Sequence, residues 1–506
     1  MKIAHNETIT IEDVALVSLD KATVILDEET KKRVQESHQR LVNILETEKP
    51  VYGINTGFGI FASKTINNCD ISKLNRNLIL SHSVGTGEPL ADKLVRAAMF
   101  IRAVSLSQGF SGIRLEVIQR ILDMINKGVT PVVPGKGSLG SSGDLCQLSH
   151  MALVISKDEK DLEEESGTAK YDGVIQSGKT AMEKAGIERI ILNAKEGLAL
   201  NNGATFTAAI GALSVYEAEY LLHIAEIAAS LSMEALCARA EPLDDRIHQT
   251  RHQIGQIISA RNISELIEGS TFINSDARVQ DAYSIRCAPQ VHGAVRDTVQ
   301  HVRRIIENEI NAATDNPLIF EPNEALSGGN FHGEPLGMVM DFLAIALCEL
   351  GAISERRTSR LIDEKTNYGL PPMLVANTEE AGLHSGLMMP HYTAASLVLE
   401  NQTLATPDSI RSLPTSAGQE DHNANAMTAA RHAYEIINNV RQILSIEIYT
   451  ALRAIYLRKN LMDGILGAGT GKIYNNMKQM IQSKTGDTLW GIEIRKINDM
   501  IVGREF

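Results

Sequence analysis

The stretch GSLGSSGDLCQL, from Gly137 to Leu148, crowds three glycines and three serines together. Residues of these types cradle phosphates, form ordinary turns, or make the backbone itself a reagent. Asp144 and Gln147 have the spacing of a capping box, so we expect a helix to start just after Gly143. Taken alone, a Ser-Ser-Gly triplet before a helix is more typical of a structural turn. The choice among the three uses depends on the surrounding sequence.

Two glycine clusters were tested as nucleotide sites. GKGSLG, residues 135–140, matches the GxGxxG spacing, but a dinucleotide site needs a strand before it. Pro131 and Pro134 break the preceding run, and the acidic residues about 20 positions later lie in a charged loop. GAGTGK, residues 467–472, fails as a phosphate loop because Leu466 stands in place of a glycine. The sequence therefore predicts no nucleotide site.

A metal site is also not indicated. The five cysteines are far apart and form no CxxC pair, which argues against a zinc site and a disulfide framework. His248 and His252 are four residues apart, but Gln249 occupies the place of the metalloprotease glutamate and no third ligand is evident. We interpret both as surface histidines.

The composition limits the partners and the compartment. With 49 Lys plus Arg against 62 Asp plus Glu, the formal charge is −13, so most of the surface repels nucleic acid phosphates. The first residues, MKIAHNETITIEDV, are charged where a signal peptide needs an apolar run. The sequence predicts a cytoplasmic protein with neither a nucleic acid partner nor a membrane span.

Helical periodicity dominates the chain. Four long segments carry it, and they cover residues 204–237, 294–313, 336–361 and 426–457. Alternating strand patterns are scarce, the best being TITIEDVALV near the start, and residues 157–173 predict a solvated loop or small hairpin. We therefore expect a mainly α fold, with a smaller mixed N-terminal region over residues 1–200 and a long-helix bundle over residues 201–506.

The longer stretch GSLGSSGDLCQLSHMALV closely resembles the block that carries the self-made electrophile of the histidine and phenylalanine ammonia-lyase family. In that family an Ala-Ser-Gly triplet cyclises to 4-methylidene-imidazole-5-one, called MIO. The resemblance implies that Gly143 supplies the attacking nitrogen, Ser141 the carbonyl and Ser142 the methylidene. Ser141 stands where alanine is usual. Its hydroxyl would project from the ring carbon, where it could form a hydrogen bond and alter the electrophilicity.

Further blocks of the same family recur in order over nearly the whole chain. VYGINTGFG resembles the mobile loop that carries a tyrosine base, here Tyr52, and NLILSHSVGTGEPL supplies His82, as in histidine-specific members. GLALNNG supplies Asn202, which the resemblance places beside the ring, and GGNFHGEP supplies Phe331 to line the site. Without the family, these four would be a packing tyrosine, a core histidine, a helix cap and a core aromatic residue.

Two more blocks imply substrate contacts. QDAYSIRCAPQ supplies Gln280, Tyr283 and Arg286 at three-residue intervals, so successive members would be neighbours if the segment is helical. The resemblance implies that Arg286 grips the substrate carboxylate with Gln280 nearby, and that Tyr283 takes part in catalysis. The alternative for Arg286 is a surface salt bridge. SLPTSAGQEDHN supplies Glu420, which in histidine-specific members meets the imidazole.

Together the blocks imply a non-oxidative ammonia-lyase that converts L-histidine to urocanate and ammonium. The family fold is mainly α, of the fumarase/aspartase-like type. It assembles as a homotetramer whose sites draw on several subunits. MIO would be the only cofactor, with no metal.

Three alternatives stay open. The first is an MIO-dependent lyase or 2,3-aminomutase for another aromatic amino acid, tyrosine or phenylalanine. The second is a helical assembly protein that has the same fold and no catalytic activity. The third is a nucleotide-binding protein that uses the glycine cluster.

Overall fold

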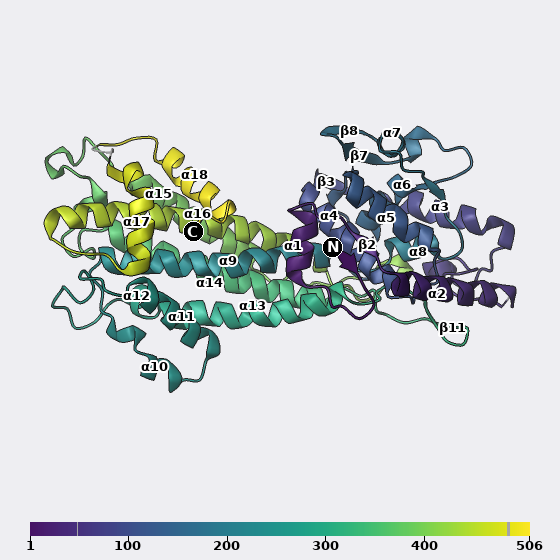
Figure 1. The fold of residues 1–506 in the computed structure, drawn as a ribbon, viewed down its shortest axis with the longest axis horizontal. Coiled ribbons are helices and arrows are strands. Elements are labelled where there is room, and N and C mark those ends of the chain that lie inside the picture. The colour runs from purple at the N-terminus through teal and green to yellow at the C-terminus, as the bar shows by residue number, and fades with distance from the viewer. Residues whose placement is uncertain (48, 483–485) are drawn as a thin grey trace. The chain divides into compact units, whose positions relative to one another are not determined.

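The computed structural model describes residues 1–47, 49–482 and 486–506, and most of this chain is helical (Figure 1). It divides into two compact units, each assembled from three separate parts of the sequence. Unit 1 comprises Met1–Tyr216, Val302–Asp341 and Pro407–Arg431, and unit 2 comprises Glu217–His301, Phe342–Thr406 and His432–Phe506. The prediction of a mainly α protein built from long helices is confirmed.

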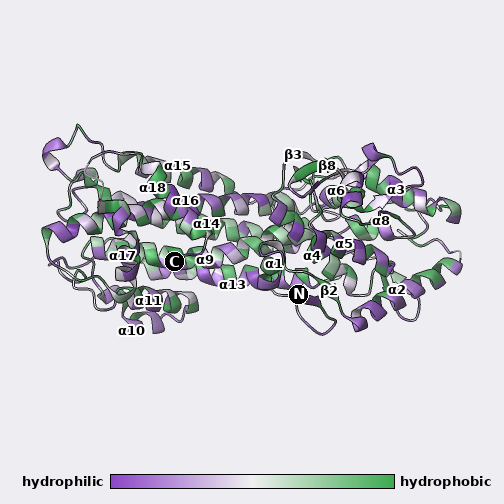
Figure 2. Cartoon of the chain, turned by 45° about the horizontal axis from the view of Figure 1, so that its top comes forward, coloured by the Kyte–Doolittle hydropathy of each residue, from purple (hydrophilic) through white to green (hydrophobic). Residues whose placement is uncertain are grey.

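The four long helices lie where the periodicity predicts them. They are α9 (Thr205–Ala235), α13 (Ala288–Ile310), α14 (Glu334–Ile362) and α16 (Ala426–Leu461). Only α13 begins well before the predicted segment, because Pro289 lies in its first turn, where the missing N–H of proline has no partner to lose. Its valine and isoleucine stripe is buried, and hydrophobic and hydrophilic residues alternate along it in Figure 2.

Unit 1 holds shorter helices and most of the strands. The helices are α1 (Ile11–Ser18), α2 (Glu28–Glu46), α3 (Ile71–His82), α4 (Asp92–Ser107), α5 (Leu115–Lys127), α6 (Leu145–Ile155), α7 (Gly178–Lys184) and α8 (Glu196–Asn201). Helix α4 packs against α1 and α5 and is buried on all sides from Leu94 to Ser107, so it is the core of this unit. The strands are short. They form β1 (Lys2–Ile3) with β2 (Ile25–Leu26), β3 (Thr86–Pro89) with β5 (Pro134–Lys136), β6 (Ser156–Lys157) with β9 (Ile190–Ile191), and β10 (Leu318–Phe320) with β11 (Glu324–Leu326).

The charged segment 157–173 forms a hairpin, as predicted. Strand β7 (Thr168–Tyr171) pairs antiparallel with β8 (Val174–Ser177), and β4 (Thr130–Pro131) extends this sheet. The two linking residues, Asp172 and Gly173, both have positive φ, 50° and 76°. Such a turn matches the natural twist of a two-residue hairpin.

Unit 2 is a helix bundle. Besides the long helices it contains α10 (Asp245–Gln249), α11 (Ile254–Leu266), α12 (Tyr283–Arg286), α15 (Met388–Leu404), α17 (Ala468–Gln482) and α18 (Trp490–Val502). A fully buried ion pair joins α14 to α16, where Arg357 Nε lies 2.5 Å from Glu447 Oε1. Ser232 of α9 and Ser354 also donate to Glu447. Buried charges are stable only when paired in this way, so the network fixes the alignment of three helices.

Helix α14 is the one helix in the described part of the chain that is long and apolar enough to cross a membrane. Its most apolar 18-residue window is 72% buried inside the protein. The core helix of a protein outside membranes passes the same test, so this observation is weak evidence for a span.

The strand predicted from TITIEDVALV is wrong, because residues 11–18 form α1. Thr10 and Asp13 make a capping box, in which the Thr10 side chain accepts from Asp13 N and Asp13 accepts from Thr10 N. The alternation of threonine and isoleucine ends at this cap, and the buried Ile11, Val14 and Ala15 follow helical spacing.

The interpretation of His248 as a surface residue is also wrong. Its side chain is fully buried, its Nε2 lies 3.0 Å from Pro242 O, and its Nδ1 lies 2.9 Å from Gln256 Nε2. A ring with both nitrogens hydrogen-bonded can be buried at little cost. His252 is exposed, as expected.

Candidate active site

The Ser141–Ser142–Gly143 turn lies directly before α6, where the sequence places it. Gly143 has φ +76°, and a Cβ built on it would lie 2.1 Å from the carbonyl carbon of Gly203. Gly143 and Gly203 are bridged side by side, and Asp144 N donates to Gly203 O at 2.9 Å. Only glycine fits this contact, both for its φ and for the space available.

Asp144 lies at the N-terminus of α6, but the predicted capping box is wrong. The Asp144 carboxylate makes no cap bond to its own helix; it accepts from Thr207 N at 2.8 Å, Thr207 Oγ1 at 3.0 Å and Ser138 Oγ at 2.9 Å. Gln147 instead donates to Pro134 O. Burial raises the pKa of Asp144, and these hydrogen bonds lower it. Asp144 therefore caps α9, and the N-termini of α6 and α9 meet beside the triplet.

The carbonyl oxygen of Ser142 is held by two donors. Asn202 Nδ2 lies 2.8 Å from it and the backbone nitrogen of Gly203 lies 3.4 Å from it. Asn202 is buried, so its role is this contact rather than the capping of α9. Two N–H groups aimed at one oxygen, beside two helix N-termini, stabilise negative charge that develops on that oxygen.

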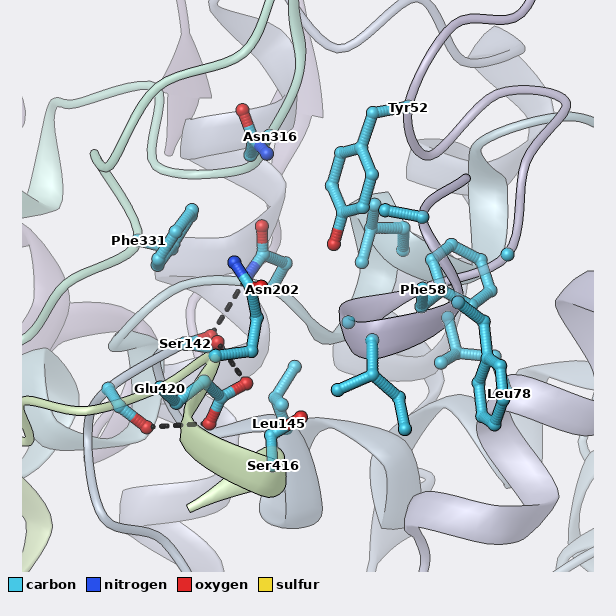
Figure 3. Close-up of a pocket in the computed structure, with 18 of the residues that line it drawn as sticks. Tyr52, Phe58, Leu78, Ser142, Leu145, Asn202, Asn316, Phe331, Ser416 and Glu420 are labelled. Carbon is cyan, nitrogen blue, oxygen red and sulfur yellow. Dashed lines mark hydrogen bonds between the residues drawn. The ribbon is translucent and has the colours of Figure 1, made fainter. Parts of the chain in front are cut away.

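Glu420 contacts both serines of the triplet, and Figure 3 shows its carboxylate beside Ser142. Ser142 Oγ donates to its Oε1 at 3.0 Å, and Ser141 Oγ donates to its Oε2 at 3.1 Å. The loop that carries Glu420 is closed by Thr415, whose backbone nitrogen donates to Glu420 O at 2.8 Å. Inside this loop Ser416 and Ala417 both have φ +52°, a conformation that is strained for residues other than glycine. Strain of this kind is typical of functional loops.

A cavity of about 1110 Å³ opens over the triplet, entirely within unit 1. Of the predicted site residues, it is lined by Tyr52, His82, Ser141, Ser142, Asn202, Phe331 and Glu420. Figure 3 shows the Tyr52 hydroxyl pointing into the cavity, with Phe331 beside Asn202 on the wall across from it. The structure thus brings together seven predicted side chains that lie between Tyr52 and Glu420 in the sequence.

The Tyr52 phenol and the His82 imidazole are both shifted by their surroundings. Burial raises the pKa of Tyr52, and the charge of Glu420 raises it further, while a backbone hydrogen bond from Gly59 lowers it. Burial lowers the pKa of His82, which the charge of Glu420 only partly offsets. His82 is therefore neutral at pH 7, with Ser81 Oγ 3.0 Å from its Nδ1.

Gln280, Tyr283 and Arg286 do not line this cavity and belong to unit 2. Tyr283 and Arg286 share the short helix α12, whereas Gln280 precedes it, so only these two are neighbours on a helix. Tyr283 is 71% exposed, and the guanidinium of Arg286 lies 4.7 Å above its ring. No carboxylate pairs with Arg286 in residues 1–47, 49–482 and 486–506, so the alternative of a surface salt bridge is not supported.

The cavity also contains polar residues that sequence reasoning did not select. They include Lys64, Asn77, Asn316, Ser327, Gln419, Asp421, His332 and His422. The rings of His332 and His422 are stacked, with centroids 5.9 Å apart and planes 11° apart. Two of these could have been found from the sequence, because His332 is next to Phe331 and His422 comes two residues after Glu420. Nothing local marks Asn316.

No group of three His, Cys, Asp or Glu side chains that could hold a metal ion occurs among the residues described. The polar lining of the cavity consists of serines, carboxylates, amides, histidines, one lysine and the phenol of Tyr52.

The long-helix fold is shared with solved amino acid lyases and aminomutases. A model of the aromatic amino acid lyase family matches residues 9–479, and the chain belongs to this family. The predicted family is thus confirmed.

Relatives and solved structures agree with this membership. The histidine ammonia-lyase of Caldanaerobacter subterraneus subsp. tengcongensis is 46% identical, over 99% of this chain and 96% of its own. The crystal structure of histidine ammonia-lyase from Trypanosoma cruzi is 36% identical, with a TM-score of 0.89 over 99% of this chain and 94% of its own. Pantoea agglomerans phenylalanine aminomutase is 32% identical, with a TM-score of 0.91 over 98% of each chain.

Proposed function

We propose that this protein is a histidine ammonia-lyase, which converts L-histidine to urocanate and ammonium. The observation that carries the proposal is the placement of Glu420 and His82 on the cavity that contains Ser142. A carboxylate and a neutral imidazole can accept and donate the hydrogen bonds of a second imidazole ring. Relatives named histidine ammonia-lyase match almost the whole chain, which supports the same substrate.

The triplet Ser141–Ser142–Gly143 fits the formation of MIO. Gly143 has no side chain to obstruct its nitrogen, and the space around it excludes any other residue. The ring oxygen would be that of Ser142, which already has Asn202 and Gly203 as donors. When formed, MIO supplies an electrophilic methylidene carbon for the substrate amine. No separate cofactor or metal is proposed.

The residues around the triplet have different proposed roles toward the substrate. Glu420 and His82 bind the imidazole, and Phe331 packs against the substrate from the wall of the cavity. Tyr52 removes the β-proton, which it can do only as the phenolate. Burial and Glu420 raise the pKa of Tyr52, so a positive charge near its hydroxyl would favour the phenolate. Lys64 lines the same cavity, and a second cation could come from outside unit 1.

Arg286 can supply that charge if it comes from another copy of the chain. We propose a homotetramer in which the exposed segment with Gln280, Tyr283 and Arg286 completes the cavity of a neighbouring subunit. Arg286 would grip the substrate carboxylate, with Gln280 beside it, and Tyr283 would take part in catalysis. Tyr283 is 71% exposed and Arg286 pairs with no carboxylate in the described part of the chain, so both side chains are available to a second copy. The proposed binding partner besides the other subunits is a small amino acid substrate, and neither nucleic acid nor a membrane is proposed. The proposed location is the cytoplasm.

The test is the appearance of urocanate absorbance with L-histidine as substrate. The Ser142→Ala variant is the control, because it cannot form the methylidene, and intact mass of the parent should show the loss of two waters. L-tyrosine and L-phenylalanine are assayed in parallel, with analysis for β-amino acids. Preference for either, or formation of a β-amino acid, would overturn the proposal in favour of another lyase or an aminomutase. An inactive chain of full mass would indicate a helical assembly protein.

A further inference from the structure

We infer that Ser141 is a positioning residue for Glu420. Its hydroxyl holds one oxygen of the carboxylate so that the other faces the ring of the substrate. The inference rests on the proposed function and deepens it, since it assigns a task to the serine that stands where the family usually has alanine.

The two oxygens of Glu420 are held by different groups. Oε2 accepts from Ser141 Oγ at 3.1 Å and from Thr415 Oγ1 at 3.4 Å, whereas Oε1 accepts from Ser142 Oγ at 3.0 Å. The Ser142 hydroxyl is the group that leaves as water when the triplet condenses. After condensation Oε1 has lost its donor and Oε2 has kept both of its own. The cavity then contains a carboxylate with one free, outward-facing oxygen.

The environment makes the Ser141 contact effective. Ser141 is only 8% exposed, so little water reaches its hydroxyl, and hydrogen bonds to an ionised group are stronger than those between neutral groups. The Glu420 side chain has three rotatable bonds and lies on a loop that leaves it open to the cavity. A donor on Oε2 removes most of this rotational freedom before substrate arrives. Preorganisation of this kind favours a ring that offers an N–H to Oε1 over a ring that has none.

A binding experiment isolates this task from the chemistry. In the Ser142→Ala background the triplet cannot form the methylidene and Oε1 has no serine donor, so the background imitates the freed carboxylate. Titration calorimetry with L-histidine compares Ser142→Ala with Ser141→Ala/Ser142→Ala. We expect about tenfold weaker binding when the Ser141 hydroxyl is removed, as for a lost hydrogen bond to a charged group. L-phenylalanine, whose ring has no N–H, should bind both variants equally.

Two further variants control the comparison. Ser141→Thr keeps the hydroxyl and should restore binding of L-histidine in the same background. Ser107→Ala removes a buried hydroxyl that donates to Ala103 O within its own helix, and Ser107 does not line the cavity, so this change should leave the affinity unchanged. Equal affinity in the presence and absence of the Ser141 hydroxyl would overturn the inference, and so would an equal loss for L-phenylalanine.

Turnover gives the second readout. Ser141→Ala in the otherwise unchanged chain should still lose two waters in intact mass, while KM for L-histidine rises about tenfold and kcat changes much less. If the two waters are retained, Ser141 acts in condensation and the positioning role is wrong. The proposed function fails separately, when the parent protein forms no urocanate from L-histidine.

Discussion

Asp144 and Thr207 are joined by two hydrogen bonds, from the backbone nitrogen and from the hydroxyl of Thr207 to the two carboxylate oxygens. Asp144 follows the triplet, and Thr207 lies in the first turn of α9. Ala204, directly before that helix, has no side-chain acceptor, so a carboxylate 63 residues away in sequence does the capping. Asp144 therefore holds two features in place. It follows the last residue of the triplet, and it caps α9, the helix that comes after Asn202 and Gly203 in the sequence.

The first prediction concerns the stability that this contact provides. Asp144→Ala leaves the buried N–H of Thr207 without its acceptor and removes the shorter hydrogen bond of two hydroxyls, because Ser138 Oγ keeps only Gly143 O at 3.3 Å and Thr207 Oγ1 only Met427 Sδ at 3.9 Å. We therefore expect a loss of about 2–4 kcal/mol in the free energy of unfolding. Comparative urea denaturation measures the loss. Asp123→Ala is the matched control, because that carboxylate is half-exposed and pairs only with its own helix. A loss no larger than that of the control would contradict the capping role.

The second prediction concerns the donor on the Ser142 oxygen. Asn202→Asp keeps the shape of the side chain but replaces the donor at 2.8 Å with an acceptor. Loss of one donor to an oxygen that gains negative charge lowers kcat by about 10²–10³-fold. The measurement is steady-state urocanate formation, with intact mass to confirm that condensation has occurred. A variant that condenses fully and keeps its kcat would exclude Asn202 from the stabilisation of that oxygen.

The third prediction concerns pH. Burial, with Glu420, raises the pKa of Tyr52 above its ordinary value, so at neutral pH the phenol is protonated and the phenolate is the minor form. If the phenolate is the base, kcat/KM rises with pH from about 7 towards 10. Tyr52→Phe should lower kcat by about 10²–10⁴-fold and abolish that rise. Glu420→Gln removes one cause of the raised pKa and should move the rise to lower pH.

His82 adds a second limit to the same profile. Its pKa is lowered, so it stays neutral down to pH values below its ordinary range, and its protonation does not limit activity near pH 7. If protonation of His82 lowers kcat/KM, the fall in the pH profile should therefore appear only at acid pH, and His82→Gln should remove that fall.

The long helices could be predicted because their signal is local. The stripe of α13 and the boundaries of α9, α14 and α16 follow from residues three and four positions apart. The strand predicted for residues 8–17 is wrong for a local reason too, since these residues show two-residue alternation and also contain the Thr10 and Asp13 capping box that starts α1. A short segment that fits both strand alternation and helical spacing stays ambiguous until it is known which of its side chains are buried.

The sequence could predict which residues form the site, but it could not predict the contacts among them. Family blocks led to Tyr52, His82 and Glu420, and the structure places all three on one cavity. The contact of Ser141 with Glu420 joins residues 279 positions apart, and that of Asp144 with Thr207 joins residues from different helices, so no periodicity reveals either. Local spacing even gave the wrong partner for Asp144, because a capping box and a carboxylate that caps another helix look alike in sequence.

The fourth prediction concerns sites shared between copies. If Arg286 completes the cavity of a neighbouring subunit, then Arg286→Ala and Glu420→Gln damage different parts of a site built from two chains. Each variant alone should lose most of its activity. When the two are unfolded together and refolded, mixed tetramers contain some sites with both intact residues, so a measurable fraction of parental activity should return. Urocanate formation before and after co-refolding measures it, and each variant refolded alone is the control. No recovery, in mixtures that a mass difference between the chains shows to be hybrid, would contradict the shared site.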